Sequence, residues 1–135
     1  MRAIRRDDTT AELRVRSALH RLGVRYRVKN RDLPGSPDLA NRSRGWVLFV
    51  NGCFWHGHRN CPHTGAGHRY RVPVANCEYW ELKLAENRRR DARVARLLRK
   101  QGFRVYIIWE CQSGNVDAVA LRNQLARTHT ALKTI

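Results

Sequence analysis

Cysteine and histidine side chains gather in one short stretch of this sequence, which holds Cys53, His56, His58, Cys61, His63 and His68. Zinc in structural sites binds four nitrogen or sulfur ligands in a closed tetrahedron. Three of the residues supply ligands at C-x4-H-x2-C spacing, namely Cys53, His58 and Cys61. Cys111 ends a later apolar run and is the best candidate for the fourth ligand. The alternative is that the cysteines are buried thiols and the histidines are solvated.

A second candidate site centres on Asp38, one of only 11 acidic residues in the chain. Asp38 follows the turn-forming segment Pro34-Gly35-Ser36-Pro37 and starts a new extended stretch. Hydrolysis of a phosphodiester at neutral pH calls for Mg²⁺, which carboxylates and substrate phosphates hold. Asp38 is placed to be such a ligand, and Glu12 could contact the metal indirectly. The alternatives are a turn aspartate and a capping-box glutamate that follows Thr9.

Phe54 and Trp55 closely follow the apolar run 46–50, and Trp80 lies near the start of a helical stretch. Aromatic side chains on a basic surface can stack on bases or wedge between base steps. The alternative, that these rings cover the hydrophobic core, fits the pattern equally well.

Hydrophobic periodicity predicts the elements that position these residues. We expect helices over 9–22, 76–101 and 117–130, and strands over 24–28, 38–40, 46–50 and 104–109. The order is one helix, three strands, a helix, a strand and a helix. It predicts a single α/β domain over residues 1–135, with helices flanking a central mixed sheet.

The balance of charge points to a polyanionic partner. The chain of 135 residues has 27 Lys and Arg against 11 Asp and Glu, a net charge of +16, and all but four of its cations are arginines. Arginine grips phosphate with two parallel hydrogen bonds, so we expect nucleic acid to be the partner. The longest apolar runs have five residues, too few to span a bilayer, and no apolar stretch of a signal peptide follows Arg2, Arg5 and Arg6. We therefore expect a cytoplasmic, nucleoid-associated protein.

Several motifs together resemble the very-short-patch mismatch-repair (Vsr) endonuclease family. They are Leu33-Pro34-Gly35-Ser36-Pro37-Asp38, Asn51-Gly52-Cys53-Phe54-Trp55-His56-Gly57-His58, Tyr79-Trp80 with Lys83, Asn87 with Arg90-Asp91, and Arg104-Val105-Tyr106-Ile107-Ile108-Trp109-Glu110-Cys111. The resemblance extends to about residue 112 and implies a fold like that of type II restriction enzymes, of the PD-(D/E)XK type. It also implies Mg²⁺-dependent nicking of duplex DNA 5′ to the thymine of a T·G mismatch, which arises when 5-methylcytosine deaminates.

The resemblance further assigns roles to particular residues. Asp38 matches the aspartate that binds the catalytic Mg²⁺, the carbonyl of Val50 is a further ligand by position, His56 matches the proposed general base, and Glu12 lies near the metal. Cys53, His58, Cys61 and Cys111 match the structural zinc ligands, and Phe54, Trp55 and Trp80 match the intercalating aromatic residues. The family also suggests a monomer that recruits a MutL-type mismatch-repair protein.

Two departures from the family pattern keep other functions open. Asn51 stands where the family commonly has an active-site histidine, and the chain starts inside the family's usual N-terminal region, so the DNA-embracing arm is expected to be short. One alternative is a zinc-stabilised DNA-binding module without chemistry. The other is a restriction-type nuclease of the same fold that cuts matched DNA.

Overall fold

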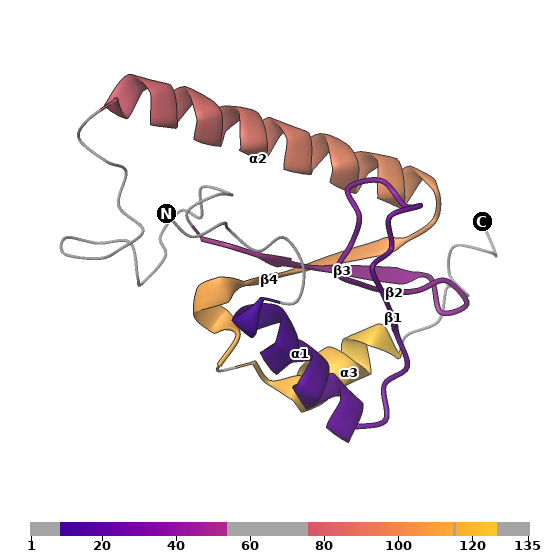
Figure 1. The fold of residues 1–135 in the computed structure, drawn as a ribbon. Helices are drawn as coiled ribbons and strands as arrows, with labels where there is room; N and C mark the ends of the chain where they lie inside the picture. The colour runs from indigo at the N-terminus through magenta and orange to yellow at the C-terminus, as the bar shows by residue number, and fades with distance from the viewer. Residues whose placement is uncertain (1–8, 54–75, 115, 127–135) are drawn as a thin grey trace.

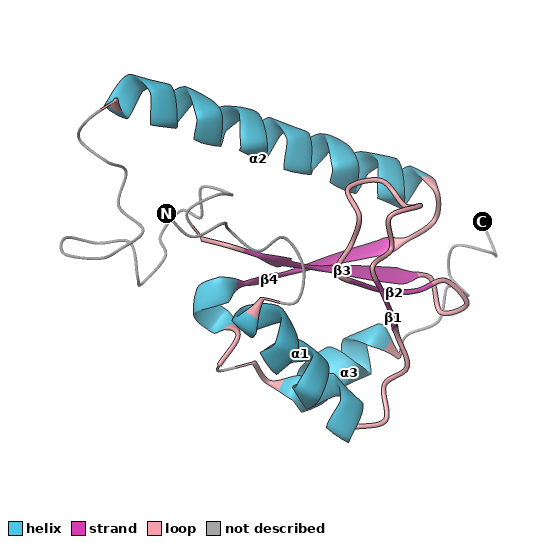
Figure 2. Cartoon of the chain, in the orientation of Figure 1, coloured by secondary structure: helices cyan, strands magenta, loops and turns pink. Residues whose placement is uncertain are grey.

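The computed structural model describes residues 9–53, 76–114 and 116–126. Its elements, in chain order, are α1 (Thr10–Arg21), β1 (Arg27–Val28), β2 (Leu39–Asn41), β3 (Trp46–Asn51), α2 (Cys77–Lys100), β4 (Arg104–Trp109), the 3-10 helix η1 (Glu110–Gln112) and α3 (Ala118–Leu125). The helices and strands form three layers, in which α1 and α3 cover one face of the sheet and α2 covers the other (Figures 1 and 2). The described residues thus form a mixed α/β fold.

The four strands lie in the order β1-β2-β3-β4. β1 and β2 pair antiparallel, as do β2 and β3, whereas β3 and β4 pair parallel with Asn51 opposite Trp109. The long helix α2 makes the crossover that parallel neighbours require. Because β3 and β4 run in the same direction, the residues that follow them emerge at the same edge of the sheet.

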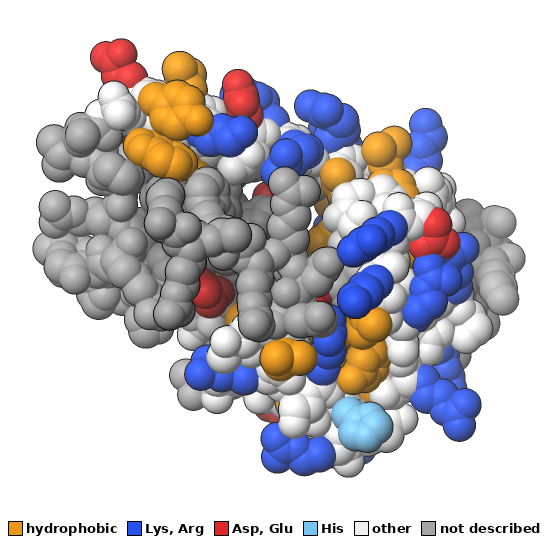
Figure 3. All heavy atoms as spheres, in the orientation of Figure 1, with side chains coloured by type: hydrophobic (Ala, Val, Ile, Leu, Met, Phe, Trp, Pro, Cys, Tyr) orange, Lys and Arg blue, Asp and Glu red, His pale blue; other side chains and the backbone are white. Residues whose placement is uncertain are grey.

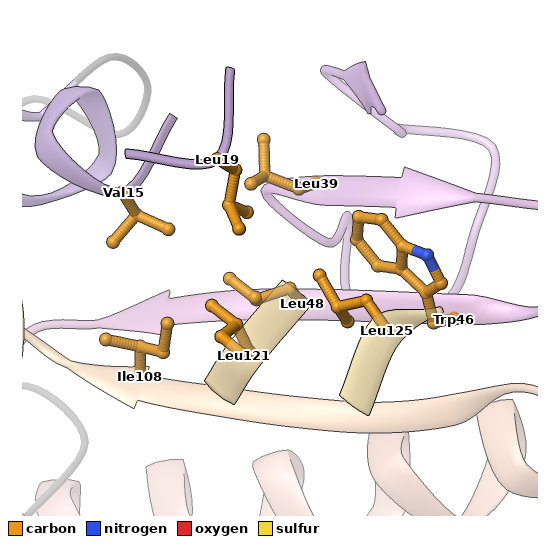
Figure 4. Close-up of a cluster of buried hydrophobic side chains, with 8 residues drawn as sticks. All are labelled: Val15, Leu19, Leu39, Trp46, Leu48, Ile108, Leu121 and Leu125. Atoms are coloured by element: carbon orange, nitrogen blue, oxygen red, sulfur yellow. The ribbon is translucent and has the colours of Figure 1, made fainter. Parts of the chain in front are cut away.

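Side chains of β3 alternate between two hydrophobic clusters, one on each face of the sheet. Trp46 and Leu48 pack toward α1 and α3, in the cluster of Val15, Leu19, Leu39, Trp46, Leu48, Ile108, Leu121 and Leu125 that Figure 4 shows. Val47 and Phe49 pack toward α2, in a second cluster with Leu33, Ala40 and Leu98. Cover on both faces explains why the strand sequence is an unbroken apolar run.

The structure confirms the mixed sheet and the order of the elements. β3 and β4 match the predicted strands to within one residue, and α1 starts after Thr9, whose hydroxyl accepts a hydrogen bond from the Glu12 N–H at 3.2 Å. The last helix is described from Ala118 to Leu125, and residues 127–130 of its predicted span lie outside the described residues.

Two predictions of secondary structure need correction. The strand predicted over 24–28 is reduced to Arg27–Val28, although its side chains still alternate in exposure. Its partner β2 ends at Asn41, and there the side chain of Asn41, not its main chain, donates to the Arg25 carbonyl at 3.1 Å. The 3-10 helix after β4 was not predicted. It forms because the Ser113 N–H and hydroxyl both donate to the Glu110 carbonyl.

The turn before Asp38 packs against α2 at Gly35, which yields a stability prediction. Gly35 has φ +71°, and a Cβ atom there would come closer than 3.0 Å to Val94 Cγ1. Gly23 has a similar φ of +76° but nothing within 4 Å of such a Cβ atom. Gly35→Ala should therefore lower the free energy of unfolding by about 1–3 kcal/mol more than Gly23→Ala, since overpacking adds to backbone strain.

Urea unfolding of both variants measures this difference. Val94→Ala should cost less stability in the Gly35→Ala background than in the parent, because it removes the clashing methyl groups. Equal losses for Gly35→Ala and Gly23→Ala would show that α2 does not press on this turn.

Candidate active site

Asp38 lies directly before β2, and its carboxyl group completes the hydrogen bonding of β3. The Val50 N–H donates to Asp38 Oδ2 at 2.6 Å. Continuing the β2–β3 register by two residues places Val50 opposite Pro37, which has no N–H to give to the Val50 carbonyl. The antiparallel ladder therefore stops before Val50. The Asp38 carboxyl group accepts the hydrogen bond of the Val50 N–H and lies near the Val50 carbonyl.

The turn that carries Asp38 is held by Asn30, a residue that the sequence reasoning missed. Asn30 is fully buried and donates to the carbonyls of Arg27, at 2.8 Å, and Pro37, at 3.1 Å. Its own carbonyl accepts from Arg27 Nε at 2.9 Å. These bonds fix the residue that precedes Asp38, so Asn30 is a positioning residue. In sequence it shows only the general preference of asparagine for turns.

Helix α1 brings Glu12 to Asp38. Glu12 is only 3% exposed, lies in the first turn of α1, and its carboxylate accepts from Arg16 Nη2 at 2.6 Å. Burial and the hydrogen bond with Glu12 raise the pKa of Asp38 from its ordinary 3.8 to about 8, and the negative charge of Glu12 adds to the effect. The Val50 N–H and Arg16 act in the opposite direction on that pKa but do not cancel the rise. Two carboxyl groups in contact favour a shared proton or a cation.

This arrangement fits Mg²⁺. The ion prefers carboxylate and carbonyl oxygens and keeps several of its waters, so one or two carboxylates suffice. Asp38 would bind the ion directly, and the Val50 carbonyl would be a second ligand. Glu12 would lie beside Asp38 and help to balance the positive charge of the ion. Within the described ranges, no group of three or more His, Cys, Asp or Glu side chains is placed to hold a metal ion. A bound Mg²⁺ would take further ligands from substrate phosphate and water.

The parallel pair of strands brings Cys53 and Cys111 together. The register that aligns Asn51 with Trp109 continues to this pair, and the Cys111 N–H donates to Cys53 Sγ at 3.4 Å. Cys53 is 1% exposed. A buried sulfur that accepts a main-chain hydrogen bond is a suitable environment for a zinc-bound thiolate. His58 and Cys61, the other two predicted zinc ligands, lie outside the described residues.

The remaining predicted site residues divide into two groups. Asn51 is buried at the end of β3, and Trp80 lies in the first turn of α2, partly exposed and edge-on to Tyr79 with ring centroids 5.2 Å apart. His56, Phe54 and Trp55 lie outside the described residues. Asp38, Glu12 and Val50 therefore form the part of the site that the structure brings together.

A mixed sheet between helices, with a carboxyl pair at the end of its central strands, is consistent with an endonuclease-like fold. Comparison with known proteins agrees. The family model described as DNA mismatch endonuclease Vsr matches residues 1–62. A relative from Xanthomonas oryzae pv. oryzae, the type II nicking enzyme V.XorIIP, is 41% identical over 123 residues, which cover 90% of this chain and 85% of the relative.

Two further relatives extend the comparison. The DNA mismatch endonuclease Vsr of Escherichia coli is 40% identical over 111 residues, covering 82% of this chain and 67% of that protein. The type II nicking enzyme V.NmeAIP of Neisseria meningitidis is 36% identical over 115 residues, covering 85% and 77%. The chain belongs to the Vsr family of endonucleases. It is a DNA endonuclease, a hydrolase. No helix in the described part of the chain has the length and apolar character needed to cross a membrane.

The raised pKa of Asp38 predicts how stability depends on pH when Mg²⁺ is left out. Above about pH 4 the unfolded chain has lost this proton, whereas the folded chain keeps it up to about pH 8. Folding therefore takes up a proton between these values, and the free energy of unfolding falls as pH rises, by at most about 1.4 kcal/mol per pH unit. Asp38→Asn keeps an acceptor for Val50 and a donor for Glu12 without the charge. Its stability relative to the parent should rise from pH 5 to pH 8.

Urea unfolding at a series of pH values measures this. Asp32→Asn is the control. Desolvation raises the pKa of Asp32, but a backbone hydrogen bond and the charges of Arg27 and Arg42 together lower it by more. Its contribution to stability changes only as pH falls from the ordinary pKa of 3.8 through that lowered pKa, so Asp32→Asn should differ from the parent by a constant amount from pH 5 to pH 8. The same constant difference for Asp38→Asn would mean that Asp38 does not share a proton with Glu12.

Proposed function

We propose that the protein hydrolyses one phosphodiester bond of duplex DNA, 5′ to the thymine of a T·G mismatch left by deamination of 5-methylcytosine. The observation that carries this proposal is the Asp38 carboxyl, fixed beside the end of β3 by the Val50 N–H and in contact with Glu12. The name of the Escherichia coli relative, a mismatch endonuclease, supports the choice of substrate. The net charge of +16 supplies the attraction to DNA.

In this proposal the residues of the site hold Mg²⁺ and position water. Asp38 and the Val50 carbonyl would bind the ion. When bound, Mg²⁺ would stabilise charge on the scissile phosphate and on the leaving 3′ oxygen. Glu12 places a second carboxyl group beside Asp38, and Arg16 holds Glu12 in place. His56 would accept the proton of the attacking water, and the products would be a 5′ phosphate and a 3′ hydroxyl.

Recognition of the mismatch would fall to the aromatic residues. Trp80 lies in the first turn of α2, the helix on the face of the sheet opposite α1, and is partly exposed beside Tyr79. With Phe54 and Trp55 it would enter the base stack, where a mismatched step costs less to open than a paired one. A zinc ion on Cys53, His58, Cys61 and Cys111 would fasten the segment after β3 to the end of β4. Such a site can supply about 10 kcal/mol of folding free energy.

Nicking of end-labelled duplexes that differ only by T·G against C·G tests the proposed function. With Mg²⁺ the parent should nick the T·G duplex on the 5′ side of the thymine and leave the C·G duplex intact, and without Mg²⁺ it should nick neither. Asp38→Asn should slow nicking by at least about 100-fold, because a neutral amide binds Mg²⁺ weakly. Asp117→Asn, which keeps an N-cap on α3, is the control and should nick at the parent's rate.

Equal rates on the two duplexes would instead make the protein a nicking enzyme for matched DNA. Undiminished nicking by Asp38→Asn would remove Asp38 from the metal site. If neither duplex is nicked at any Mg²⁺ concentration, the proposed reaction and substrate are wrong.

The zinc proposal has its own test. Cys111→Ser should lose the metal and melt at a lower temperature than the parent, as measured by elemental analysis and thermal unfolding. Cys77→Ser is the matched control, because Cys77 lies on α2 and its Sγ contacts Glu81 Oε1 at 3.3 Å. This variant should keep the zinc. Parent protein that holds no zinc after growth with added zinc would contradict the site.

A further inference from the structure

A cavity of about 330 Å³ lies at the β1–β2 edge of the sheet, away from the residues assigned to catalysis. Its lining includes three arginines, Arg25, Arg27 and Arg42, together with Asn30, Asn41 and Ser43. This volume is at the lower end of the range for ligand sites. Figure 3 shows Lys and Arg side chains over α2 and over the side of the molecule where β1 and β2 lie. The cavity therefore offers convergent donors for an anion.

Hydrogen bonds organise these arginines before any ligand binds. Arg27 Nε donates to the buried side-chain oxygen Oδ1 of Asn30 at 2.9 Å, which sets the direction of the Arg27 guanidinium group. The Asn41 side chain donates to the Arg25 carbonyl and accepts from the Arg44 N–H at 3.0 Å, so it ties Arg25 to the turn that carries Arg42. The Arg27 guanidinium, held by Asn30, loses little freedom when it binds phosphate, and the Asn41 bonds fix the main chain that carries Arg25 and Arg42.

Asp32 shows that two of the guanidinium groups converge on one anion. Arg27 Nη2 donates to Asp32 Oδ1, and Arg42 Nη2 donates to Asp32 Oδ2. Asp32 and both arginines are about half exposed, and ion pairs at such exposure contribute little stability. A phosphate can therefore replace or join Asp32 at small cost, and Arg25 leaves the group of four with a net positive charge of two.

Protection of the sheet edge does not account for the whole cluster. Charged residues on an edge strand do prevent pairing with other chains, and this suffices for Arg25 and Arg27. Arg42, however, lies in the turn after β2, where no strand could add, and it still faces the same anion. Convergence from two segments indicates a binding site.

The position of the cavity relative to Asp38 identifies the ligand. Asp38 directly precedes β2 and Arg42 directly follows it, so about 13 Å of extended chain separates them. Phosphates of one DNA strand follow one another every 3.4 Å or so along the duplex axis, so about four nucleotide steps cover this distance. We propose that the Arg25–Arg27–Arg42 cavity binds a backbone phosphodiester of the same duplex, a few nucleotides from the bond that Asp38 serves. This inference rests on the proposed placement of the scissile phosphate at Asp38.

Binding measured without Mg²⁺ tests the cavity separately from catalysis. Arg25→Gln with Arg42→Gln should weaken binding several-fold to T·G and C·G duplexes alike, because a phosphate contact carries no sequence information. The slope of log affinity against log salt should become shallower by about one unit. Arg21→Gln removes one charge from the exposed last turn of α1, outside the cavity, and should change neither. Asp32→Asn should tighten binding several-fold, a gain that misfolding cannot produce.

Duplexes with one neutral methylphosphonate at successive positions then locate the phosphate. One position should weaken binding by the parent but not weaken binding by the Arg25→Gln, Arg42→Gln variant any further. Failure to find such a position, or an Asp32→Asn variant that binds no tighter than the parent, would overturn the proposed phosphate site. Neither result depends on nicking. Failure of the proposed phosphate site can therefore be distinguished from failure of the proposed function.

Discussion

The hydrogen bond from the Val50 N–H to Asp38 fixes the carboxyl group of the candidate site to a central strand of the sheet. It exists because β2 begins at Leu39, two residues after Pro37, the position that would pair with Val50 if the ladder continued. The open donor at the end of a buried central strand therefore receives a carboxyl group, and Glu12 from α1 meets that carboxyl from the other side. The segment that carries Asp38 is held against the sheet by the two core clusters, by the buried Asn30 and by the packing of Gly35 on α2.

Charge is distributed in a way that suits a carboxyl site for DNA. Two acids in contact would by themselves repel a phosphate backbone, and a net charge of +16 over the chain reverses that field. Arg16 holds Glu12, while Arg25, Arg27 and Arg42 lie at the far end of β2. The surface can thus attract the polyanion although two carboxyl groups lie together at the candidate site.

The sequence predicted the parts of this fold that depend on local pattern. Two apolar runs located β3 and β4, and Thr9 marked the start of α1, since these features need no knowledge of neighbours. β1 was overestimated because its length depends on where β2 ends. In the site, the sequence singled out Asp38 and Glu12 separately and left two interpretations open for each. Their contact follows only from how α1 packs on the sheet. Asn30 was missed because its burial arises when the turn closes around it.

Binding of Mg²⁺ by Asp38 and the Val50 carbonyl is tested directly by crystals soaked in Mn²⁺, since this ion shares the oxygen ligands of Mg²⁺ and scatters anomalously. We expect an anomalous peak within about 2.2 Å of an Asp38 carboxyl oxygen, next to the Val50 carbonyl. A peak bound elsewhere, or none at Asp38 while the Val50 N–H bond is intact, would contradict this assignment.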